Sequence, residues 1–171
     1  GAEVFILCVG NDDDVRQVVT EALSRLADGA VIVDHTTTSA RVAREQAERA
    51  SGQGVAFIDA PVSGGDIGAR NATLSIMVGG SDAAVARAMP VLSTLGKTIV
   101  HQGPAGSGQR TKIVNQILVA ANTLGMCEAL HFASRAGLDP QRVLDSVGGG
   151  AAASWSIQVL APRVLKDDLD P

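Results

Sequence analysis

The chain has 171 residues, enough for one compact domain or somewhat more than one. Hydrophobic residues make up 46% of it and charged residues 19%, so it can bury a core and is not disordered by composition. Its formal net charge is -4 and its basic residues are scattered. This argues against a nucleic-acid partner, because binding to phosphates needs a concentrated basic face.

The cysteines and histidines indicate neither a disulfide framework nor a metal site. Cys8 and Cys127 both lie in apolar runs, and we expect them to be buried as small hydrophobic side chains. The histidines lie far apart, without metal-ligand spacing. The apolar stretches are short and no signal peptide precedes the first strand, so we expect no membrane partner and a cytoplasmic location.

The first part of the chain alternates between apolar runs and amphipathic segments. Residues 4–9 are continuously apolar, which predicts an interior parallel strand covered on both faces. A helix with one apolar face follows and ends at Gly29, and residues 30–33 predict a second buried strand. A polar, alanine-rich helix then leads to a third strand at residues 54–59. This alternation predicts a doubly wound, mostly parallel sheet of the α/β class.

Ligands of such sheets bind beyond the carboxyl ends of the strands. The loops on that side are therefore the candidates for a site, and they comprise residues 10–14, 34–39 and 61–65.

The pattern changes after residue 70. We expect strands at 72–78 and 98–101, with a helix at 81–95 between them. The segment 109–136 contains no proline and predicts a helix of roughly 40 Å, at about 1.5 Å per residue. Gly137 suits the position just after its end.

We therefore predict two parts. Residues 1–105 would form the C-terminal part of a dinucleotide-binding, Rossmann-like domain, and residues 106–171 a long interdomain helix and the beginning of an all-helical domain. The chain opens directly on a strand and stops just after a charged turn. We expect both ends to be internal to a longer protein.

The loop Asp-Ala-Pro-Val-Ser-Gly-Gly at residues 59–65 carries the first chemical signal. Ser63 is followed by Gly64 and Gly65, which leave backbone N–H groups accessible beside a hydroxyl donor. That combination suits a carboxylate or another oxyanion. An ordinary Gly-Gly turn explains the same residues equally well.

The second signal is the segment 106–116, Gly-Ser-Gly-Gln-Arg-Thr-Lys-Ile-Val-Asn-Gln. Lys112, Asn115 and Gln116 are three and four residues apart and would project from one helix face. A cation and two amides among apolar neighbours indicate a polar pocket, whereas a surface lysine on a solvated face is the alternative. No Lys-Ser or Lys-Thr follows the last glycine, so this is not a Walker A loop.

Together, these two segments resemble the β-hydroxyacid dehydrogenase family, which includes 3-hydroxyisobutyrate dehydrogenases, tartronate semialdehyde reductases and glyoxylate reductases. The resemblance extends over essentially the whole chain, including Asp-His-Thr-Thr at 34–37, which is similar to the family's Asp-x-Ser-Thr turn. It implies an NAD(P)-dependent oxidoreductase that interconverts a small hydroxy acid and its semialdehyde or keto acid. It further implies NAD or NADP as cofactor, a small carboxylate as substrate and a homo-oligomer formed through the helical domain.

The resemblance also assigns roles to residues. Lys112 would be the catalytic proton donor, placed where hydride transfer to a carbonyl leaves an oxygen that needs a cation and then a proton. The other implied site residues are Ser63, Gly64, Gly65, Asn115 and Gln116 for the substrate, and Val9, Gly10, Asp14 and Thr37 for the cofactor.

Several differences between this chain and the family's motifs narrow the range of expected reactions. The family's Gly-x-Gly-x-x-Gly fingerprint is not found in this chain, nor is its downstream Lys-Asp-Leu motif, and we expect Lys166–Leu169 to be a surface turn. Val119 stands where 6-phosphogluconate dehydrogenases carry a glutamate, which argues against oxidative decarboxylation. Lys112 argues against the related imine reductases, and Lys-x-x-Asn-Gln favours the tartronate semialdehyde or glyoxylate reductases. The rival interpretation is a non-enzymatic binding or scaffold domain, against which the intact lysine and Ser-Gly-Gly loop weigh.

Overall fold

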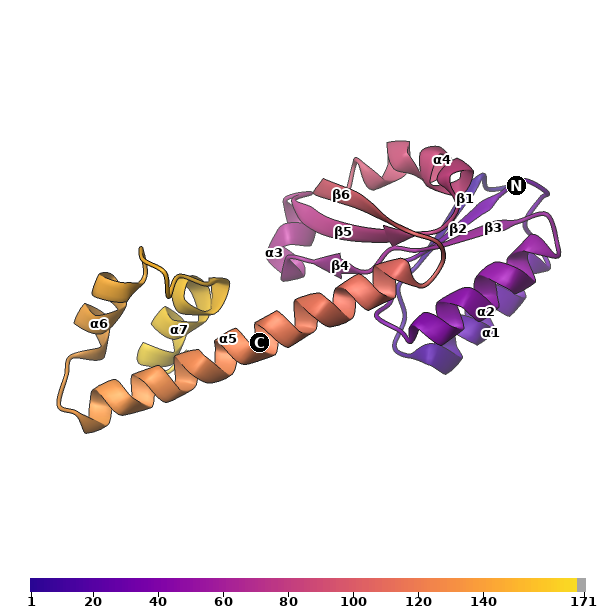
Figure 1. The fold of residues 1–171 in the computed structure, drawn as a ribbon. Coiled ribbons are helices and arrows are strands. Elements are labelled where there is room, and N and C mark those ends of the chain that lie inside the picture. Colours follow the sequence, from indigo (N-terminus) through magenta and orange to yellow (C-terminus); the bar gives the residue numbers. More distant parts are fainter. Residues whose placement is uncertain (169–171) are drawn as a thin grey trace. The chain divides into compact units, whose positions relative to one another are not determined.

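The computed structural model describes residues 1–168, and the chain divides into two compact units, Gly1–Ile113 and Val114–Pro171. The boundary lies inside one helix, α5 (Ser107–Arg135), which contributes residues to both units (Figure 1). The first unit is a sheet with helices on both faces, and the described part of the second unit is helical. The predicted α/β class, a partial Rossmann-like sheet followed by a helical part, is confirmed.

The first unit is built on a six-stranded sheet of order β1-β2-β3-β5-β4, with β6 paired to β5. Its strands are β1 (Val4–Leu7), β2 (Val31–Asp34), β3 (Ala56–Asp59), β4 (Val62–Ser63), β5 (Leu74–Gly79) and β6 (Gly96–Gly103). The pairs β1–β2, β2–β3 and β5–β6 are parallel, whereas β5 is antiparallel to β3 and β4. Leu7, Asp34 and Asp59 are partners in register, so the first three strands end level with one another.

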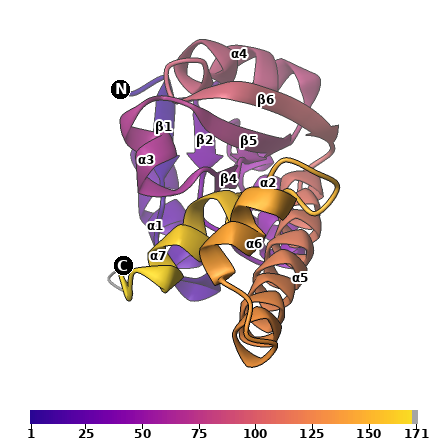
Figure 2. The same cartoon turned by 90° about the vertical axis from the view of Figure 1, so that its left-hand side faces the viewer.

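Helices cover both faces of this sheet. Figures 1 and 2 show α1 (Asp12–Leu23) and α2 (Ala40–Ser51) on one face and α4 (Asp82–Leu92) on the other. Successive strand residues point to opposite faces, so Ile32 packs with α1 and α2 whereas Val33 packs with α4. Every residue of β2 is buried for this reason, which explains its three consecutive apolar residues before Asp34.

The first strand differs from our expectation of an interior strand. Among the described strands β1 pairs only with β2, and Ile6 is 41% exposed. Its apolar run suits burial on both sides, but no described strand pairs with its outer edge. Cys8, which follows this edge strand, and Cys127, which lies on the largely exposed α5, are free and exposed, so the prediction that both are buried is wrong.

The second unit continues α5 and adds three short helical elements. They are α6 (Pro140–Val147), the π-helix η1 (Ser156–Leu160) and α7 (Ala161–Leu165). Its core consists of Met126, Leu130, Leu144 and Ala161. Gly137 has a φ of 71°, a left-handed conformation that glycine adopts without steric cost and that ends α5 near the predicted place. The turn expected at Lys166–Leu169 extends beyond the described residues.

Helix α5 is long and apolar enough to cross a membrane, the one such helix in the described part of the chain. Our expectation that the apolar stretches are too short is therefore wrong for this helix. A single helix of this kind is weak evidence for a membrane span, because it rests on length and composition alone.

The first turn of α5 lies against the sheet, and this close approach gives a test. A Cβ atom at Gly108 would collide with the carbonyl oxygens of Met77 and Asp59. We expect Gly108→Ala to lower the free energy of unfolding in urea by about 1–3 kcal/mol, the usual cost of overpacking. Gly125→Ala, on the same helix where a Cβ would meet open space, should instead stabilise by roughly 0.5–1 kcal/mol. Equal effects of the two substitutions would contradict the close approach.

Candidate active site

A buried carboxylate joins the start of α5 to the sheet. Asp59, the last residue of β3, is fully buried, and its two oxygens accept hydrogen bonds from Gly106 N at 2.7 Å and Gln109 N at 2.9 Å. The first N–H groups of a helix have no partner within the helix and attract negative charge. Burial raises the pKa of Asp59, whereas these N–H donors lower it. The carboxylate thus fixes the helix N-terminus at the carboxyl end of β3.

Glycines make this approach possible. A Cβ at Gly79 would lie 2.5 Å from Asp59 Oδ1 and 2.8 Å from Gly108 N. No side chain can therefore stand between the end of β5 and the first turn of α5. Gly79 and Gly108 are therefore required by the packing between the helix and the sheet.

Lys112 lies one helical turn after Gln109 and reaches the predicted substrate loop. Its Nζ donates a hydrogen bond to Val62 O at 2.8 Å, and Val62 directly precedes Ser63 in β4. The side chain is half-buried, and this desolvation lowers the pKa of Lys112. Two segments identified separately in the sequence therefore meet: the lysine and the Ser-Gly-Gly loop.

The backbone of this loop needs its glycines. Gly64 has a φ of 135° and Gly65 a φ of 62°, which side-chain-bearing residues rarely adopt. Both glycines are exposed, and Gly64 is the N-cap of α3 (Gly65–Arg70), a short helix absent from our sequence prediction. Ser63 is half-buried and pairs with Ser75 of β5. A hydroxyl and exposed backbone therefore adjoin the carbonyl that Lys112 contacts.

Hydrogen bonds with Gln109 hold the turn after β2 at the two residues that flank Thr37. Gln109 is fully buried, and its side-chain amide spans the turn: Nε2 donates to Thr36 O at 2.7 Å and Oε1 accepts from Thr38 N at 3.1 Å. Thr36 Oγ1 in turn accepts from Val9 N at 2.9 Å, which ties in the end of β1. Thr37, between its two buried neighbours, is exposed.

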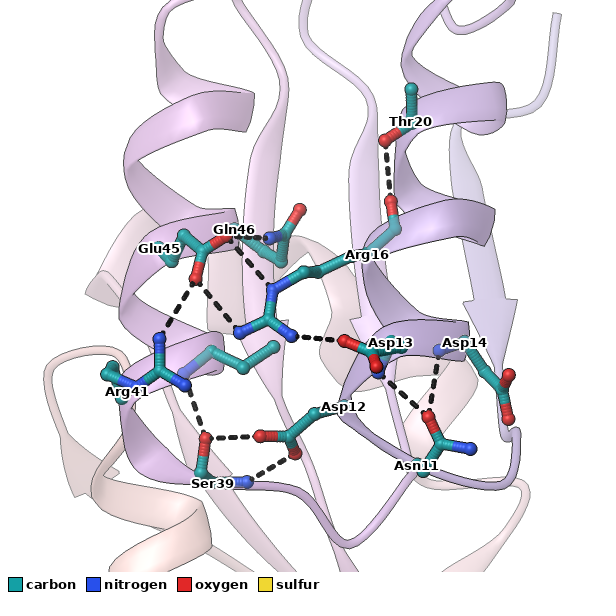
Figure 3. A network of polar contacts seen from close by, with 11 residues as sticks. Asn11, Asp12, Asp13, Asp14, Arg16, Thr20, Ser39, Arg41, Glu45 and Gln46 are labelled. Carbon is teal, nitrogen blue, oxygen red and sulfur yellow. Dashed lines mark hydrogen bonds and ion pairs between the residues drawn. The ribbon is translucent and has the colours of Figure 1, made fainter.

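The loop after β1 is fixed by hydrogen bonds to the side chains of Asn11 and Asp12, shown in Figure 3. Asn11 caps α1 by accepting hydrogen bonds from Asp13 N at 2.8 Å and Asp14 N at 3.1 Å. Asp12 accepts from Ser39 N at 3.0 Å and from Ser39 Oγ at 2.7 Å, and these bonds lower the pKa of Asp12. The starts of α1 and α2 are thereby joined.

Gly10 and Asp14, both predicted to line the cofactor side, contact each other. Gly10 N donates to Asp14 Oδ2 at 3.2 Å, so one N–H group of this loop is occupied within the loop. Their role in cofactor binding stays a prediction, as does that of Val9.

Asp34, the last residue of β2, and His35 lie in the predicted candidate loop 34–39, but neither of them was assigned a role from the sequence. Asp34 is fully buried, and burial raises its pKa to about 6, although Thr36 N donates to its Oδ1 at 2.9 Å. His35 Nδ1 lies 2.7 Å from Ala60 O, and burial lowers the pKa of its imidazole. The available signal was their position, because polar residues at the carboxyl ends of buried parallel strands face the ligand side.

The remaining predicted substrate residues, Asn115 and Gln116, belong to the second unit. Asn115 Nδ2 donates to Gln116 Oε1 at 2.8 Å, and Asn115 is half-buried whereas Gln116 is exposed. Their role at a substrate stays a prediction. No group of three or more metal-ligating side chains occurs within residues 1–168.

Two family models match this chain. The NAD binding domain of 6-phosphogluconate dehydrogenase matches residues 1–103, and the NAD-binding region of NADP-dependent 3-hydroxyisobutyrate dehydrogenase matches residues 106–171. Similar proteins include the uncharacterized oxidoreductase YkwC of Bacillus subtilis, 46% identical over 99% of this chain and 60% of that protein. The 2-hydroxy-3-oxopropionate reductase of Escherichia coli is 45% identical over 84% of this chain and 49% of the enzyme.

A solved structure is similar in fold as well. The Mycobacterium tuberculosis 3-hydroxyisobutyrate dehydrogenase, determined with L-serine, has a TM-score of 0.87 and 35% identity over 94% of this chain and 55% of that one. The chain thus spans between about half and three fifths of the length of these relatives.

The buried Asp34 should make the stability of the fold depend on pH. With its pKa raised from an ordinary 3.8 to about 6, the native state keeps a proton that the unfolded chain releases, so stability falls as pH rises through this interval. Asp34→Asn keeps an oxygen for Thr36 N and cannot ionise. We expect it to gain on the order of 2 kcal/mol relative to wild type between pH 4 and pH 7, measured by urea unfolding.

The control for this experiment is Asp66→Asn, which changes an exposed carboxylate. Its effect on stability should be nearly the same at both pH values. An Asp34→Asn effect that is equally independent of pH would contradict the burial of an ionisable Asp34.

Proposed function

The chain belongs to the β-hydroxyacid dehydrogenase family, and we propose that it carries the substrate loop and the proton donor of an oxidoreductase acting on a small hydroxy acid. The family and the NAD(P) cofactor predicted from the sequence are confirmed by the two matching models and by a related structure that holds NADP+. The proposed reaction interconverts the hydroxy acid and its semialdehyde or keto acid. The observation that carries the proposal is the 2.8 Å hydrogen bond from Lys112 Nζ to Val62 O, beside Ser63.

Lys112 is proposed to supply the proton. In the direction of reduction, a reduced nicotinamide held by the proposed cofactor residues would supply the hydride for the carbonyl carbon. The carbonyl oxygen then takes the electron pair of the broken π bond, and the Lys112 ammonium stabilises this charge and transfers one proton to it. The product is a hydroxyl group, and the neutral amine regains a proton from solvent. Partial burial favours the transfer, because it lowers the pKa of Lys112.

The Ser-Gly-Gly loop is proposed to hold the substrate carboxylate. The Ser63 hydroxyl and the N–H groups of the exposed Gly64 and Gly65 are hydrogen-bond donors next to the Lys112 contact. Relatives named for 2-hydroxy-3-oxopropionate and 3-hydroxyisobutyrate support a small hydroxy acid, and Lys-x-x-Asn-Gln favours the former, which is tartronate semialdehyde.

The turn after β2 fits an NAD(P) cofactor. Thr37 is exposed while both neighbours are held by Gln109, and the buried Thr38 hydroxyl has no partner within the described residues. A nicotinamide ribose placed there would find one exposed hydroxyl on a rigid backbone. Thr37, with Val9, Gly10 and Asp14 on the adjoining loop, forms the proposed cofactor side.

Lys112→Ala tests the proposed chemistry. In the protein at its full natural length, kcat for reduction of tartronate semialdehyde should fall by roughly 10²–10⁴-fold, the usual loss for a positioned acid. Lys112→Arg should not restore it, because guanidinium holds its proton too tightly. In the wild type, kcat should decline as pH rises through the lowered pKa of Lys112, since the donor must be protonated. Oxidation of NADH or NADPH followed by absorbance measures all three.

Lys97→Ala, an exposed lysine of β6, is the matched control and should keep wild-type kcat. A near wild-type rate for Lys112→Ala would remove the lysine from the mechanism. A wild-type protein that binds NADPH but reduces no member of a semialdehyde panel would support the scaffold interpretation instead.

Ser63→Ala tests the carboxylate site. Loss of the hydroxyl removes a hydrogen bond to a charged group, which is worth about 1.5–3 kcal/mol, so KM for the semialdehyde acid should rise at least roughly 10-fold with little change in kcat. KM for an aldehyde without a carboxylate should stay the same. Ser93→Ala, an exposed serine after α4, is the control. A fall in kcat at constant KM would assign Ser63 to the chemical step.

A further inference from the structure

We infer that Gln109 is a positioning residue that holds the proposed cofactor turn and the proposed proton donor at a fixed separation. The inference rests on the proposed function and adds to it a residue that contacts neither substrate nor cofactor. It concerns the first unit alone, since Gln109, Lys112 and the turn at 36–38 all belong to it.

Three hydrogen bonds fix Gln109 to two different strand ends. Its backbone N–H donates to Asp59 Oδ2 at 2.9 Å, at the end of β3. Its side chain donates to Thr36 O at 2.7 Å and accepts from Thr38 N at 3.1 Å, in the turn after β2. Gln109 therefore joins helix α5 to β2 and β3, whose carboxyl ends lie on the ligand side of the sheet.

The turn held by Gln109 and the helix that carries it each contain a residue with a proposed functional role. Thr37 lies between the two residues that the Gln109 amide holds, and it is exposed. Lys112 follows Gln109 by one turn of the same helix and contacts the substrate loop at Val62 O. A change at Gln109 would thus alter the distance between the cofactor side and the proton donor, without touching either group directly.

Burial makes Gln109 sensitive to substitution. Gln109, Thr36 and Thr38 are all buried, so water cannot replace the lost bonds, and Thr36 O and Thr38 N would be left unpaired. The turn would then rearrange to find other partners. Misplacement of reacting groups by about 1 Å can cost 10²-fold in rate, so kcat is the quantity that should respond.

The chain contains a matched control in Gln46. This glutamine of α2 is also fully buried and on a helix of the first unit, but its side chain bonds only to the neighbouring Glu45 and its Oε1 has no partner among the described residues. Gln109→Leu and Gln46→Leu therefore make the same chemical change at equal burial, and they differ in what the glutamine holds.

The first experiment compares these variants in the full-length protein. Gln109→Leu should lower kcat for semialdehyde reduction by roughly 10- to 100-fold, with a much smaller change in KM, because the carboxylate loop is not bonded to Gln109. The primary isotope effect with deuterated reduced nicotinamide should rise, since a misplaced hydride slows the chemical step specifically. Gln46→Leu should leave kcat and the isotope effect unchanged.

A second variant keeps the inference testable if Gln109→Leu does not fold. In Gln109→Glu the introduced carboxylate cannot donate to Thr36 O, whereas the protonated carboxyl can donate there and still accept from Thr38 N. Burial raises the pKa of a carboxyl, so the ratio of variant to wild-type kcat should increase as pH falls from about 8 to about 6. The titratable groups around this segment are Asp34, His35, Asp59 and Lys112, and the ionised carboxylate introduced by Gln109→Glu would shift their pKa values in the variant alone. The ratio is therefore also measured with Asp34→Asn in both proteins, which removes the group whose pKa is about 6.

The outcomes separate this inference from the proposed function. A Gln109→Leu protein that folds and keeps the wild-type kcat and isotope effect would overturn the inference while the proposed function stands. A ratio of Gln109→Glu kcat to wild-type kcat that does not change with pH would also overturn the inference. A wild-type protein without turnover would overturn the proposed function and, with it, the positioning role.

Discussion

The arrangement of the candidate site depends on one buried carboxylate. Asp59 is the last residue of β3 and accepts hydrogen bonds from the N–H groups of Gly106 and Gln109. It therefore holds the start of α5 at the edge of the sheet where β1, β2 and β3 end level with one another. A charge buried this deeply is costly unless strong donors compensate it, and a helix N-terminus provides such donors. Lys112, one turn further along α5, is thereby directed to the Ser-Gly-Gly loop. The positions of Gln109 and Lys112 therefore depend on the hydrogen bonds that Asp59 accepts.

Rigid secondary structure places each half of the proposed chemistry. The proton donor lies on a helix whose first turn is fixed at two glycines, and the cofactor turn is held by a buried amide. The substrate loop is the short strand β4 and the start of α3, which pair and pack with β5. Reaction rates depend steeply on the relative placement of reacting groups, and such a framework limits their movement. Exposed residues such as Thr37 can then meet a ligand without having to be ordered by it.

The sequence predicts the sheet better than the site. Apolar runs located β2 and β3, because a strand buried on both faces of a sheet is mostly apolar. The short elements at 62–70 were missed, since two strand residues and a glycine-rich helix give no periodicity. Lys112 and Ser63 came from motifs, but the roles of Asp59 and Gln109 did not. Their partners lie 47 to 73 residues away, and no local pattern records such contacts.

These long sequence separations also bear on the order in which the molecule assembles. Strands β1 and β2, with α1 between them, are neighbours along the chain and can associate early, because little loop entropy is lost when they meet. The bonds of Gln109 to the turn after β2 close loops of 71 and 73 residues and gain nothing until the intervening sheet exists. We therefore expect the N-terminal turn of α5 to dock late in folding. In the native state the same turn should open by local unfolding before the sheet does, so that its amides exchange with solvent sooner than those of β2.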